Sequence, residues 1–386
     1  MRICVVTGSR AEYGLLKNLI TLISNSSQQI LQLIVTGSHL STKFGNTYRE
    51  IQNDGFHIDR ELNLYLDVDD PMGIAKAASI GLVGFTEAYN TLRPDLLLVL
   101  GDRYEILSAV IAAAFSRIPI AHIHGGELTE GALDESIRHS ITKFSHLHFV
   151  ANEEYKKRVI QLGENPKKVF NVGGLGVDAI KSTELVSREI LEEITGVKFN
   201  KKNLLITYHP ETLRNNQENK ENFRQLLLAL ASLEETSCIF TMPNADVGNE
   251  ILYEMLQEFI SHNNYAYLVK SFGQKNYLSC LSHVDAMVGN SSSGITEAPT
   301  FKIPTINIGD RQKGRLSAKS ILNCGADCME IKKSIKKSYD KDFRKFIANT
   351  TSPYGVSGAS SKIFSVLKNV NLSSLINKKF YDLEGF

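Results

Sequence analysis

The chain has 386 residues, of which 42% are hydrophobic and 22% charged, and its formal net charge at pH 7 is +1. This length suits two domains, and the small net charge excludes strong long-range attraction to nucleic acid or to an anionic membrane. No apolar run approaches the roughly twenty residues of a membrane span, and the first residues enter a strand without the regions of a signal peptide. We therefore expect a cytoplasmic protein with no nucleic-acid or membrane partner.

The cysteines are scattered along the chain and odd in number: Cys4, Cys238, Cys280, Cys324 and Cys328. Cys324 and Cys328 lack the second pair of ligands that a structural zinc site needs. Reduced thiols in a cytoplasmic protein are therefore expected, without a metal site.

Strand and helix patterns alternate through the first half of the chain. Apolar strands are predicted at 2–7, 30–36, 95–100, 118–123, 147–151 and 169–172, and helices at 11–24, 104–115 and 134–144. Strands that are apolar on both faces and alternate with helices indicate a parallel sheet covered on both sides. Right-handed crossovers are expected to connect them.

The second half repeats this pattern after a charged, helical stretch over 176–202, which we interpret as a connection between domains. Strands are predicted at 203–208, 238–241, 266–269, 285–288 and 304–308. The expected fold is α/β, with two Rossmann-like domains facing a central cleft. The expected boundaries are 1–176 for the first domain, 177–370 for the second and 371–386 for a docked tail.

Titratable side chains gather where two strands of the first domain end, and at the start of the helix that follows. Ligands of parallel sheets bind beyond the carboxyl ends of the strands, so acids and imidazoles at these ends suggest proton chemistry. A structural interpretation competes, because Asp102 and Asp134 are also good helix caps, and Arg138 is placed to pair with Asp134. The side chains concerned are Asp102, His122, His124, Glu127, Asp134 and Arg138.

A second pattern points to a nucleotide. The strand over 285–288 runs into Gly289-Asn-Ser-Ser-Ser-Gly294, whose backbone N–H groups at a helix start suit phosphate oxygens, although a serine-rich helix cap looks the same. Glu297, one turn later, is placed to hold ribose hydroxyls or to interact with the helix dipole. Arg10 and Arg311 follow other strands and suit bidentate phosphate binding. The absence of a Walker motif argues against ATP hydrolysis.

Several motifs are spread in order from residue 1 to about residue 320: Thr7-Gly-Ser-Arg-Ala-Glu-Tyr13, Thr36-Gly-Ser-His39, Gly101-Asp-Arg-Tyr-Glu105, Gly125-Gly-Glu127, Asp134-Glu-Ser-Ile-Arg-His-Ser-Ile-Thr-Lys143, His209-Pro-Glu-Thr212 and Gly289-Asn-Ser-Ser-Ser-Gly294. Together they resemble the motifs of the hydrolysing UDP-N-acetylglucosamine 2-epimerases, most closely the bacterial sialic-acid-pathway branch. The resemblance implies the GT-B architecture, a homodimer or homotetramer, and no cofactor. It also implies conversion of UDP-N-acetylglucosamine and water to N-acetylmannosamine and UDP.

The same resemblance assigns roles to individual residues. Asp102, Asp134 and Arg138 match positions implicated in catalysis, and His39 would lie near the sugar. One departure is His124, which stands where other members carry a catalytic Glu, so that either His124 or Glu127 takes over its task. The chain also has one residue more between Gly126 and Asp134, which leaves the role of Glu130 open. The residues expected to contact UDP are Arg10, His209, Ser291, Ser292, Glu297 and Arg311.

The expected reaction begins with departure of UDP, whose negative charge the arginines and backbone N–H groups stabilise. Removal of the proton at carbon 2 gives a 2-acetamidoglucal, and water and a proton then add, the proton from the opposite face, which requires acid–base groups on both faces. Other functions stay open: a 2-epimerase of a UDP- or GDP-linked diacetamido-trideoxy sugar of legionaminic acid biosynthesis, a GT-B glycosyltransferase, and a non-catalytic nucleotide-sugar sensor.

Overall fold

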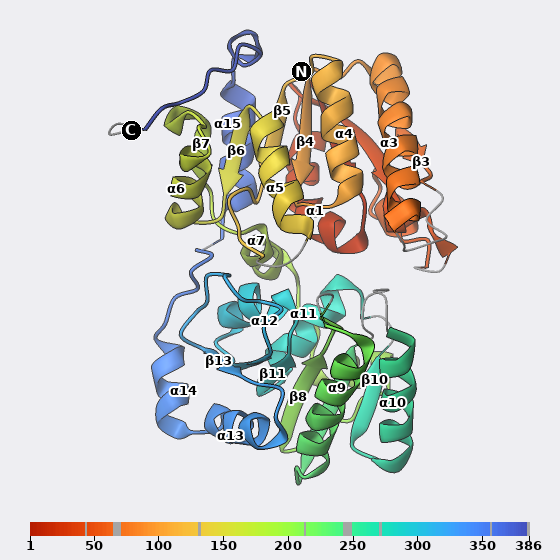
Figure 1. Cartoon of the computed structure of the whole chain (residues 1–386), viewed down its shortest axis with the longest axis vertical. Helices are drawn as coiled ribbons and strands as arrows, with labels where there is room; N and C mark the ends of the chain where they lie inside the picture. Colours follow the sequence, from red (N-terminus) through yellow and green to blue (C-terminus); the bar gives the residue numbers. More distant parts are fainter. Residues whose placement is uncertain are drawn as a thin grey trace. The chain divides into compact units, whose positions relative to one another are not determined.

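The computed structural model describes residues 1–42, 45–64, 71–129, 133–211, 214–241, 249–269, 272–355 and 357–383. The chain divides into two compact units, each built on its own parallel sheet (Figure 1). The first unit contains Met1–Leu128, Leu133–Ala179 and Tyr354–Phe386, and the second is built mainly from Ile180–Pro353. Helices alternate with the strands of both sheets, which confirms the predicted α/β class.

The sheet of the first unit reverses its strand order between β1 and β4. In sheet order its strands are β3 (Arg60–Leu62), β2 (Ile30–Thr36), β1 (Arg2–Thr7), β4 (Leu96–Leu100), β5 (Ile120–Ile123), β6 (Leu147–Val150) and β7 (Val169–Asn171). Each strand runs parallel to its neighbours. Ligands of such sheets bind at the point of reversal, outside the carboxyl ends of the strands. The loops after β1 and β4 begin at this point, and the loop after β5 begins one strand further along the same edge.

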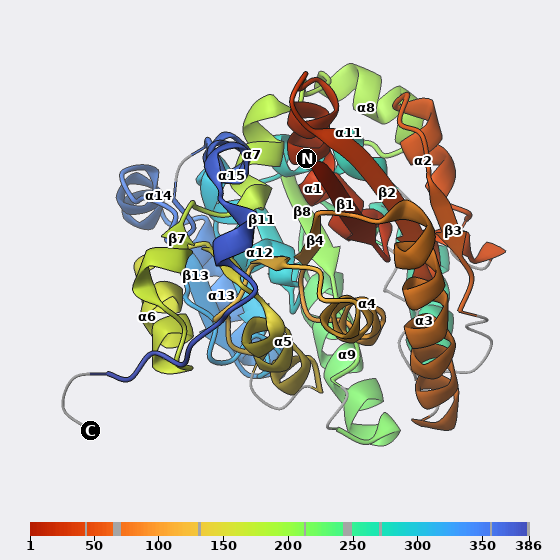
Figure 2. The same ribbon diagram turned by 90° about the horizontal axis from the view of Figure 1, so that it is seen from above.

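Alternate residues of β1 face opposite sides of this sheet and belong to two different cores. Ile3 and Val5 pack with the apolar side chains of α1 and α15, whereas Cys4 and Val6 pack with those of α3 and α4. Figure 2 shows the two groups of helices on opposite sides of the sheet. The helices of this unit are α1 (Arg10–Ser24), α2 (Tyr48–Asn53), α3 (Pro71–Leu92), α4 (Tyr104–Phe115), α5 (Leu133–Phe144), α6 (Glu153–Gln161), α7 (Leu175–Ser182) and α15 (Ala359–Asn369), with short 3-10 turns η1 (Gly37–Leu40), η3 (Pro166–Lys168) and η5 (Leu372–Ser374).

The chain returns to the first unit at Tyr354, which differs from the expected second-domain boundary at residue 370. Helix α15 packs on α1, and its Ile363 and Leu367 enter the same core as β1. The Asp178 carboxylate accepts the N–H groups of Ala359 and Ser360 at 3.0 and 2.5 Å, which fixes the start of α15. An amphipathic helix of this kind fits either sheet, so its periodicity alone does not select one.

The sheet of the second unit has the order β10-β9-β8-β11-β12-β13, again with parallel neighbours. Its strands are β8 (Lys202–Thr207), β9 (Thr236–Thr241), β10 (Ala266–Val269), β11 (Ala286–Gly289), β12 (Thr305–Ile308) and β13 (Ile321–Cys324). Its helices are α8 (Arg188–Thr195), α9 (Asn216–Ala231), α10 (Asn249–His262), α11 (Gly273–His283), α12 (Ser292–Thr296), α13 (Cys328–Ser338) and α14 (Lys341–Ala348), with the 3-10 turn η4 (Ala298–Phe301).

The strands predicted from the sequence all form, with small shifts at their ends. Strands β3 and β13 were not predicted. Both lie at the edge of a sheet, and their side chains are largely not buried, so neither gives the continuous apolar run on which the prediction depended. Within the part of the chain that the structure describes, no helix has both the length and the apolar character needed to cross a membrane.

Candidate functional site

The first cluster of predicted site residues forms around Arg138, which α5 places beside the loop after β4. Arg138 is 1% exposed, and its guanidinium pairs with the carboxylate of Asp102. It also donates to the carbonyl oxygen of Glu127 and to Oε2 of Glu135, each at 3.0 Å. Burial alone would lower the pKa of Arg138, but the charges of Asp102 and Glu127 hold it above its usual value. Asp102 and Arg138 are therefore brought together as one charged pair.

Glu135 is a part of this cluster that the sequence reasoning missed. Its Oε1 lies 3.1 Å from Nε2 of His139, while its Oε2 accepts from Arg138. The three residues lie within about one turn of α5, so that the spacing of Glu135 from Arg138 along a helix was the signal that could have revealed it.

His124 and Glu127 form a second pair at the end of β5. Nδ1 of His124 lies 3.2 Å from Oε1 of Glu127, and Nε2 of His124 accepts the N–H of Leu175 at 3.5 Å. The proton of a neutral His124 therefore belongs on Nδ1, facing the carboxylate. His124 has a φ of +67°, a left-handed conformation that is uncommon for residues other than glycine and is often found at functional sites.

Asp134 lies in the first turn of α5, with its side chain exposed. Desolvation by surrounding protein atoms, together with repulsion from Asp102, raises the pKa of Asp134 above its usual value. A carboxyl with a raised pKa near an ionised partner is a typical acid–base arrangement. Glu130, whose role the sequence left open, lies outside the described residues.

A buried carboxyl lies beneath the loops that carry Arg10 and Asp102. Glu12 accepts the N–H of Gly8 at 2.7 Å, and burial followed by repulsion from Glu105 raises its pKa to about 8. Glu105 in turn accepts from Nε of Arg103 at 2.7 Å. Sequence reasoning gave Glu12 no role, although its place in the turn after β1 was visible.

Two residues expected to bind substrate lie near the end of β1. Arg10 is the first residue of α1. His39 is fully buried, with Nε2 3.1 Å from the hydroxyl of Thr7 and Nδ1 2.8 Å from that of Thr47. Burial lowers the pKa of His39 to about 4. With both ring nitrogens occupied, His39 supports the loops around β1 in this structure and does not present a free nitrogen to a sugar.

The second unit holds the serine-rich turn at the carboxyl end of β11. Asn290 within it is fully buried and clamps the backbone of His209. It accepts the His209 N–H at 2.7 Å and donates to the His209 carbonyl at 2.8 Å. The carbonyl of Asn290 accepts from Arg311 at 3.1 Å and from Gln312 at 2.9 Å. Asn290, which directly precedes the predicted UDP contacts Ser291 and Ser292, is thereby joined to the predicted contacts His209 and Arg311.

Ser291 and Ser292 begin a helix that is short. Ser291 caps α12, which spans Ser292–Thr296. Further along, the hydroxyl of Ser293 donates to Glu297 and accepts from the hydroxyl of Tyr277 at 2.6 Å. Burial raises the pKa of Glu297, which the Ser293 hydrogen bond partly offsets. Burial, with the Arg311 charge, lowers the pKa of His209 to about 3.

The loop after β12 is held by a residue that the sequence reasoning did not single out. Glu211 is buried, accepts the N–H of Asp310 at 3.3 Å and accepts from Nε of Arg214 at 2.6 Å. The Asp310 backbone is next to Arg311, so Glu211 fixes the loop that carries this arginine. Its position two residues after His209 in the same motif was the available signal.

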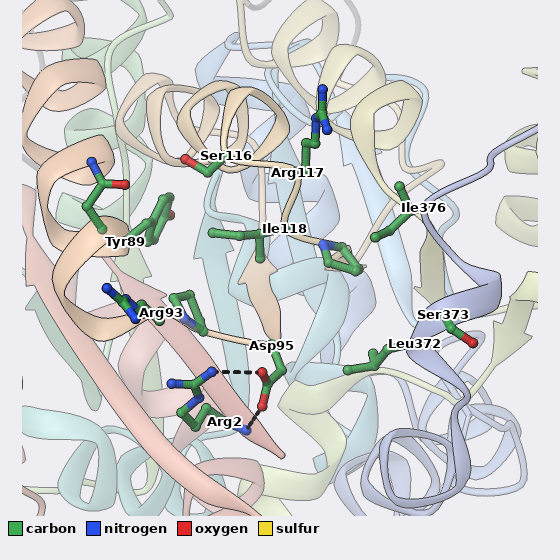
Figure 3. Close-up of a pocket in the computed structure, with 13 residues that line it drawn as sticks. Arg2, Tyr89, Arg93, Asp95, Ser116, Arg117, Ile118, Leu372, Ser373 and Ile376 are labelled. Carbon is green, nitrogen blue, oxygen red and sulfur yellow. Dashed lines mark hydrogen bonds and ion pairs between the residues drawn. The ribbon is translucent and has the colours of Figure 1, made fainter.

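A cavity of about 690 Å³ lies at the opposite edge of the first sheet (Figure 3). Its lining includes Arg2, Asp95 and Pro119, at the amino ends of β1, β4 and β5. Arg2 and Asp95 form an ion pair at 3.0 Å across it. Asp102 follows the other end of β4, so this cavity is separate from the candidate site.

The predicted site residues therefore form two sets, one in each unit. Asp102, Arg138, His124 and Glu127 gather at the carboxyl edge of the first sheet, with Asp134 close to them. Arg10 and His39 also belong to this unit. The second unit carries the remaining expected UDP contacts: His209, Ser291, Ser292, Glu297 and Arg311.

Comparisons with known proteins place these features in a family. Residues 23–368 match the family model described as UDP-N-acetylglucosamine 2-epimerase. The chain is 43% identical over 384 residues to the GDP/UDP-N,N'-diacetylbacillosamine 2-epimerase (hydrolyzing) of Campylobacter jejuni, covering 99% of each protein. It is 38% identical over 384 residues to the polysialic acid biosynthesis protein P7 of Escherichia coli, covering 99% of this chain and 97% of that protein.

The fold is similar to that in the crystal structure of the UDP-GlcNAc 2-epimerase from Neisseria meningitidis bound to UDP-GlcNAc. The TM-score is 0.82 at 20% sequence identity, over 96% of this chain and 100% of the other. This likeness, with the two parallel sheets, confirms the predicted GT-B type of fold. Since the family model covers most of its length and the Campylobacter jejuni relative matches nearly all of it, this chain belongs to the UDP-N-acetylglucosamine 2-epimerase family.

Proposed function

We propose that this protein is a hydrolysing 2-epimerase of a nucleotide-linked diacetamido sugar of the N,N'-diacetylbacillosamine type. The observation that carries the reaction type is the set of acid–base groups at the carboxyl edge of the first sheet: the Asp102–Arg138 pair, the His124–Glu127 pair and the neighbouring Asp134. The choice of sugar is supported by the name of the Campylobacter jejuni relative, which is 43% identical to this chain. This is the alternative that the sequence analysis left open.

In this proposal the second unit holds the nucleotide. Backbone N–H groups of the turn at Ser291 and Ser292 and the guanidinium of Arg311 bind diphosphate oxygens, and Glu297 accepts from ribose hydroxyls. The Asn290 clamp keeps His209 and Arg311 in fixed positions relative to this turn. Preorganised donors of this kind stabilise the negative charge that builds up as the nucleoside diphosphate leaves.

The first unit performs the proton steps. Asp102, which contacts Arg138, removes the proton at carbon 2 as the bond from carbon 1 to the diphosphate oxygen breaks, giving a glucal. A group on the other face then returns a proton to carbon 2, while the oxygen of a water molecule bonds to carbon 1 and releases one of its protons to solvent. Asp134, whose pKa is raised, is suited to hold the proton that is returned. His124, with Nδ1 3.2 Å from Oε1 of Glu127, is the second candidate.

A second candidate is the same reaction on UDP-N-acetylglucosamine, which was the first expectation from the sequence. The family description and the solved Neisseria meningitidis relative favour it. The two candidates differ only in the groups at carbons 4 and 6 of the sugar and in the nucleotide, so the same residues serve both.

The test is incubation of the protein in heavy water with UDP- and GDP-linked N,N'-diacetylbacillosamine and with UDP-N-acetylglucosamine. We expect the 2-epimer of the diacetamido sugar, free of nucleotide and carrying deuterium at carbon 2, to form fastest. Faster turnover of UDP-N-acetylglucosamine would favour the second candidate. Retention of the original hydrogen would rule out the glucal route, and transfer only to an added sugar would indicate a glycosyltransferase.

The variant Asp102→Asn should lower turnover by about 10²-fold or more, the usual contribution of a general base. Asp95→Asn is a matched control, because Asp95 precedes the same strand at its opposite end and pairs with Arg2. It should remain active. Equal losses in both variants would contradict a catalytic role for Asp102.

A further inference from the structure

His122 is a buried histidine that the proposed reaction does not use. It lies on β5, is fully buried, and stands opposite Val99 of β4 and His148 of β6 in the sheet register. Its Nε2 is 2.9 Å from the carbonyl oxygen of Gly101, the residue immediately before Asp102. Gly101 has a φ of +89°, so the peptide that leads into Asp102 is turned sharply just where His122 contacts it.

The direction of this hydrogen bond is fixed by chemistry. A carbonyl oxygen only accepts, so Nε2 of His122 carries the proton. Burial lowers the pKa of His122 to about 3, which leaves the ring neutral and Nδ1 as an acceptor. Nδ1 lies 3.3 Å from the hydroxyl of Thr142.

Thr142 connects the ring to the helix that carries Arg138. Its hydroxyl is also 3.0 Å from the Arg138 carbonyl, so one hydroxyl proton serves two acceptors. The contacts form a closed ring: Gly101 to His122, His122 to Thr142, Thr142 to Arg138, and Arg138 to the Asp102 carboxylate. His122 thus contacts the residue before Asp102 directly, and it is connected to the backbone of Arg138 through Thr142.

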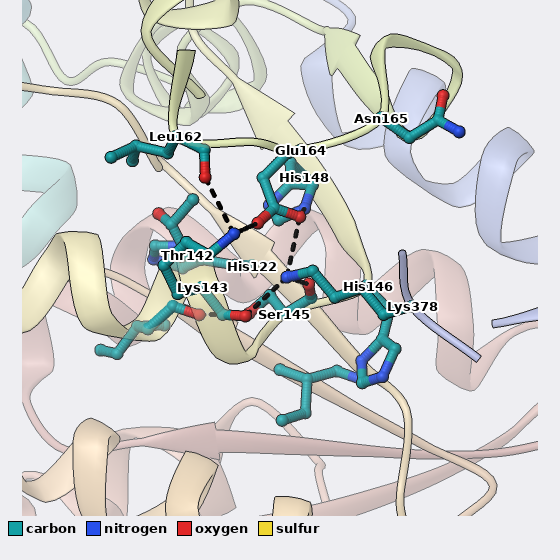
Figure 4. A network of polar contacts seen from close by, with 12 residues as sticks. His122, Thr142, Lys143, Ser145, His146, His148, Leu162, Glu164, Asn165 and Lys378 are labelled. Atoms are coloured by element: carbon teal, nitrogen blue, oxygen red, sulfur yellow. Dashed lines mark hydrogen bonds and ion pairs between the residues drawn. The ribbon is translucent and has the colours of Figure 1, made fainter. Parts of the chain in front are cut away.

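The loop after β5 leaves room for this contact. A Cβ on Gly125 would come within 3.1 Å of the Thr142 hydroxyl and 3.2 Å of Nδ1 of His122. Figure 4 shows His122 and Thr142 beside the separate group around His148 and Glu164. Nε2 of His148 is 2.9 Å from Glu164, so the neighbouring histidine serves a different set of contacts.

From this ring we infer that His122 is a positioning residue, whose Nε2–H holds the Gly101 carbonyl and thereby sets the place of the Asp102 carboxylate relative to Arg138. This inference rests on the proposed role of Asp102. It predicts an effect on the rate of the chemical step and little effect on substrate binding, since His122 is buried behind the loop. A displacement of about 1 Å at a reacting group is enough to cost on the order of 10²-fold in rate.

The experiment compares His122→Leu, His122→Gln and the matched control His148→Leu, with kcat, KM and Tm measured for each. Leu removes the donor. We expect His122→Leu to lower kcat by roughly 10- to 100-fold with KM changed less than about threefold. Gln offers an N–H near the position of the imidazole Nε2, so His122→Gln should recover most of kcat. His148→Leu should lower Tm to a similar degree while keeping kcat near that of the unchanged protein.

Several results would overturn the inference: an unchanged kcat in His122→Leu, equal losses in the Leu and Gln variants, or a loss of kcat in His148→Leu as large as in His122→Leu. An unchanged protein that turns over no nucleotide sugar would defeat the proposed function instead. In that case ¹⁵N-histidine NMR still decides the geometry. His122 should be neutral with its proton on Nε2 from pH 5 to 8, and a proton on Nδ1 or a titration in this range would refute the contact.

Discussion

Glu12 and Asp102 are acidic residues of the same unit whose nearest charged neighbours have opposite signs. Asp102 contacts the guanidinium of Arg138, a positive charge. Glu12 is buried and near Glu105, which together raise its pKa to about 8, and so Glu12 is mostly protonated at neutral pH. Arg103 forms an ion pair with Glu105 at 2.7 Å. Two carboxyl side chains of one unit therefore meet opposite charges, a guanidinium beside Asp102 and a second carboxyl group beside Glu12.

The raised pKa of Glu12 makes the folded state sensitive to alkali. The pKa of Glu12 is about 8 in the folded chain, and its ordinary value is 4.5. Between pH 4.5 and pH 8, Glu12 therefore keeps its proton in the folded chain and loses it in the unfolded chain. Stability contributed by this proton is full below pH 4.5 and is lost as pH rises through 8. Against Glu12→Gln, which keeps an acceptor for the Gly8 N–H, the unchanged protein should lose on the order of 2–4 kcal/mol from pH 4.5 to 8.5.

Urea unfolding at a series of pH values measures this difference. The comparison with Glu12→Gln cancels the titration of all other groups, provided these keep their surroundings. If the free energies of unfolding of the two proteins changed with pH in the same way, the pKa of Glu12 would not be raised in the folded protein.

At the scale of the element, the turn after β11 depends on one glycine. Gly289 has a φ of +132°, and a Cβ there would lie 2.0 Å from the carbonyl oxygen of Thr207 on β8. This close approach lets Asn290 follow directly and reach the backbone of His209. A side chain at position 289 would separate β11 from β8 at the edge where the nucleotide is proposed to bind.

Gly289→Ala should therefore lower the free energy of unfolding by roughly 3 kcal/mol or more, from the strained φ and the clash together. It should also weaken UDP binding measured by titration calorimetry. Gly196→Ala is the matched control, because Gly196 also has a positive φ, +72°, but nothing lies within 4 Å of its Cβ position. This control should cost about 1 kcal/mol and leave UDP affinity unchanged. Equal effects of the two changes would contradict the importance of the β8–β11 approach.

At the scale of the molecule, the end of the chain is tied to the first unit by a buried ion network (Figure 4). Glu164, whose side chain is 2% exposed, accepts from Lys143 at 2.7 Å, from Lys378 at 2.8 Å and from His148 at 2.9 Å. Despite burial, these partners lower the pKa of Glu164 to about 2. The N–H of Tyr381 donates to the Gly163 carbonyl at 2.9 Å. The segment around Lys378 is therefore held against the first unit by these contacts.

Lys378→Met should destabilise the protein for two reasons. Glu164 would stay buried with one cation fewer beside it, and the carbonyl oxygens of Lys143 and Ser145 would lose their hydrogen bonds from Lys378. A loss of roughly 2–3 kcal/mol is expected, less than for a buried pair broken completely, since Lys143 and His148 remain. Lys379→Met, at an exposed neighbouring position, should change stability by less than about 0.5 kcal/mol. Urea unfolding measures both, and equal effects would show that the network does not hold the tail.

Much of the candidate site was visible in the sequence because the carboxyl ends of parallel strands share one edge. Asp102 and His124 follow apolar runs that form β4 and β5, and Ser291 follows β11, so their positions at these edges come from strand order alone. What the pattern did not reveal were the supporting residues. Glu135, Asn290 and Glu211 act through contacts with backbone or with side chains distant in the chain, which have no periodic signature.

The sequence by itself determined the alternation of strands and helices, hence the parallel sheets, and the motifs that mark the family, because hydrophobic periodicity and turn chemistry are local properties. Only the tertiary structure decided that α15 packs against the first sheet and that both ring nitrogens of His39 contact threonine hydroxyls. It also decided that His122 contacts the carbonyl oxygen of Gly101, next to Asp102. These depend on which buried polar groups meet across the fold, and a polar group removed from water must take whatever partner packing brings to it.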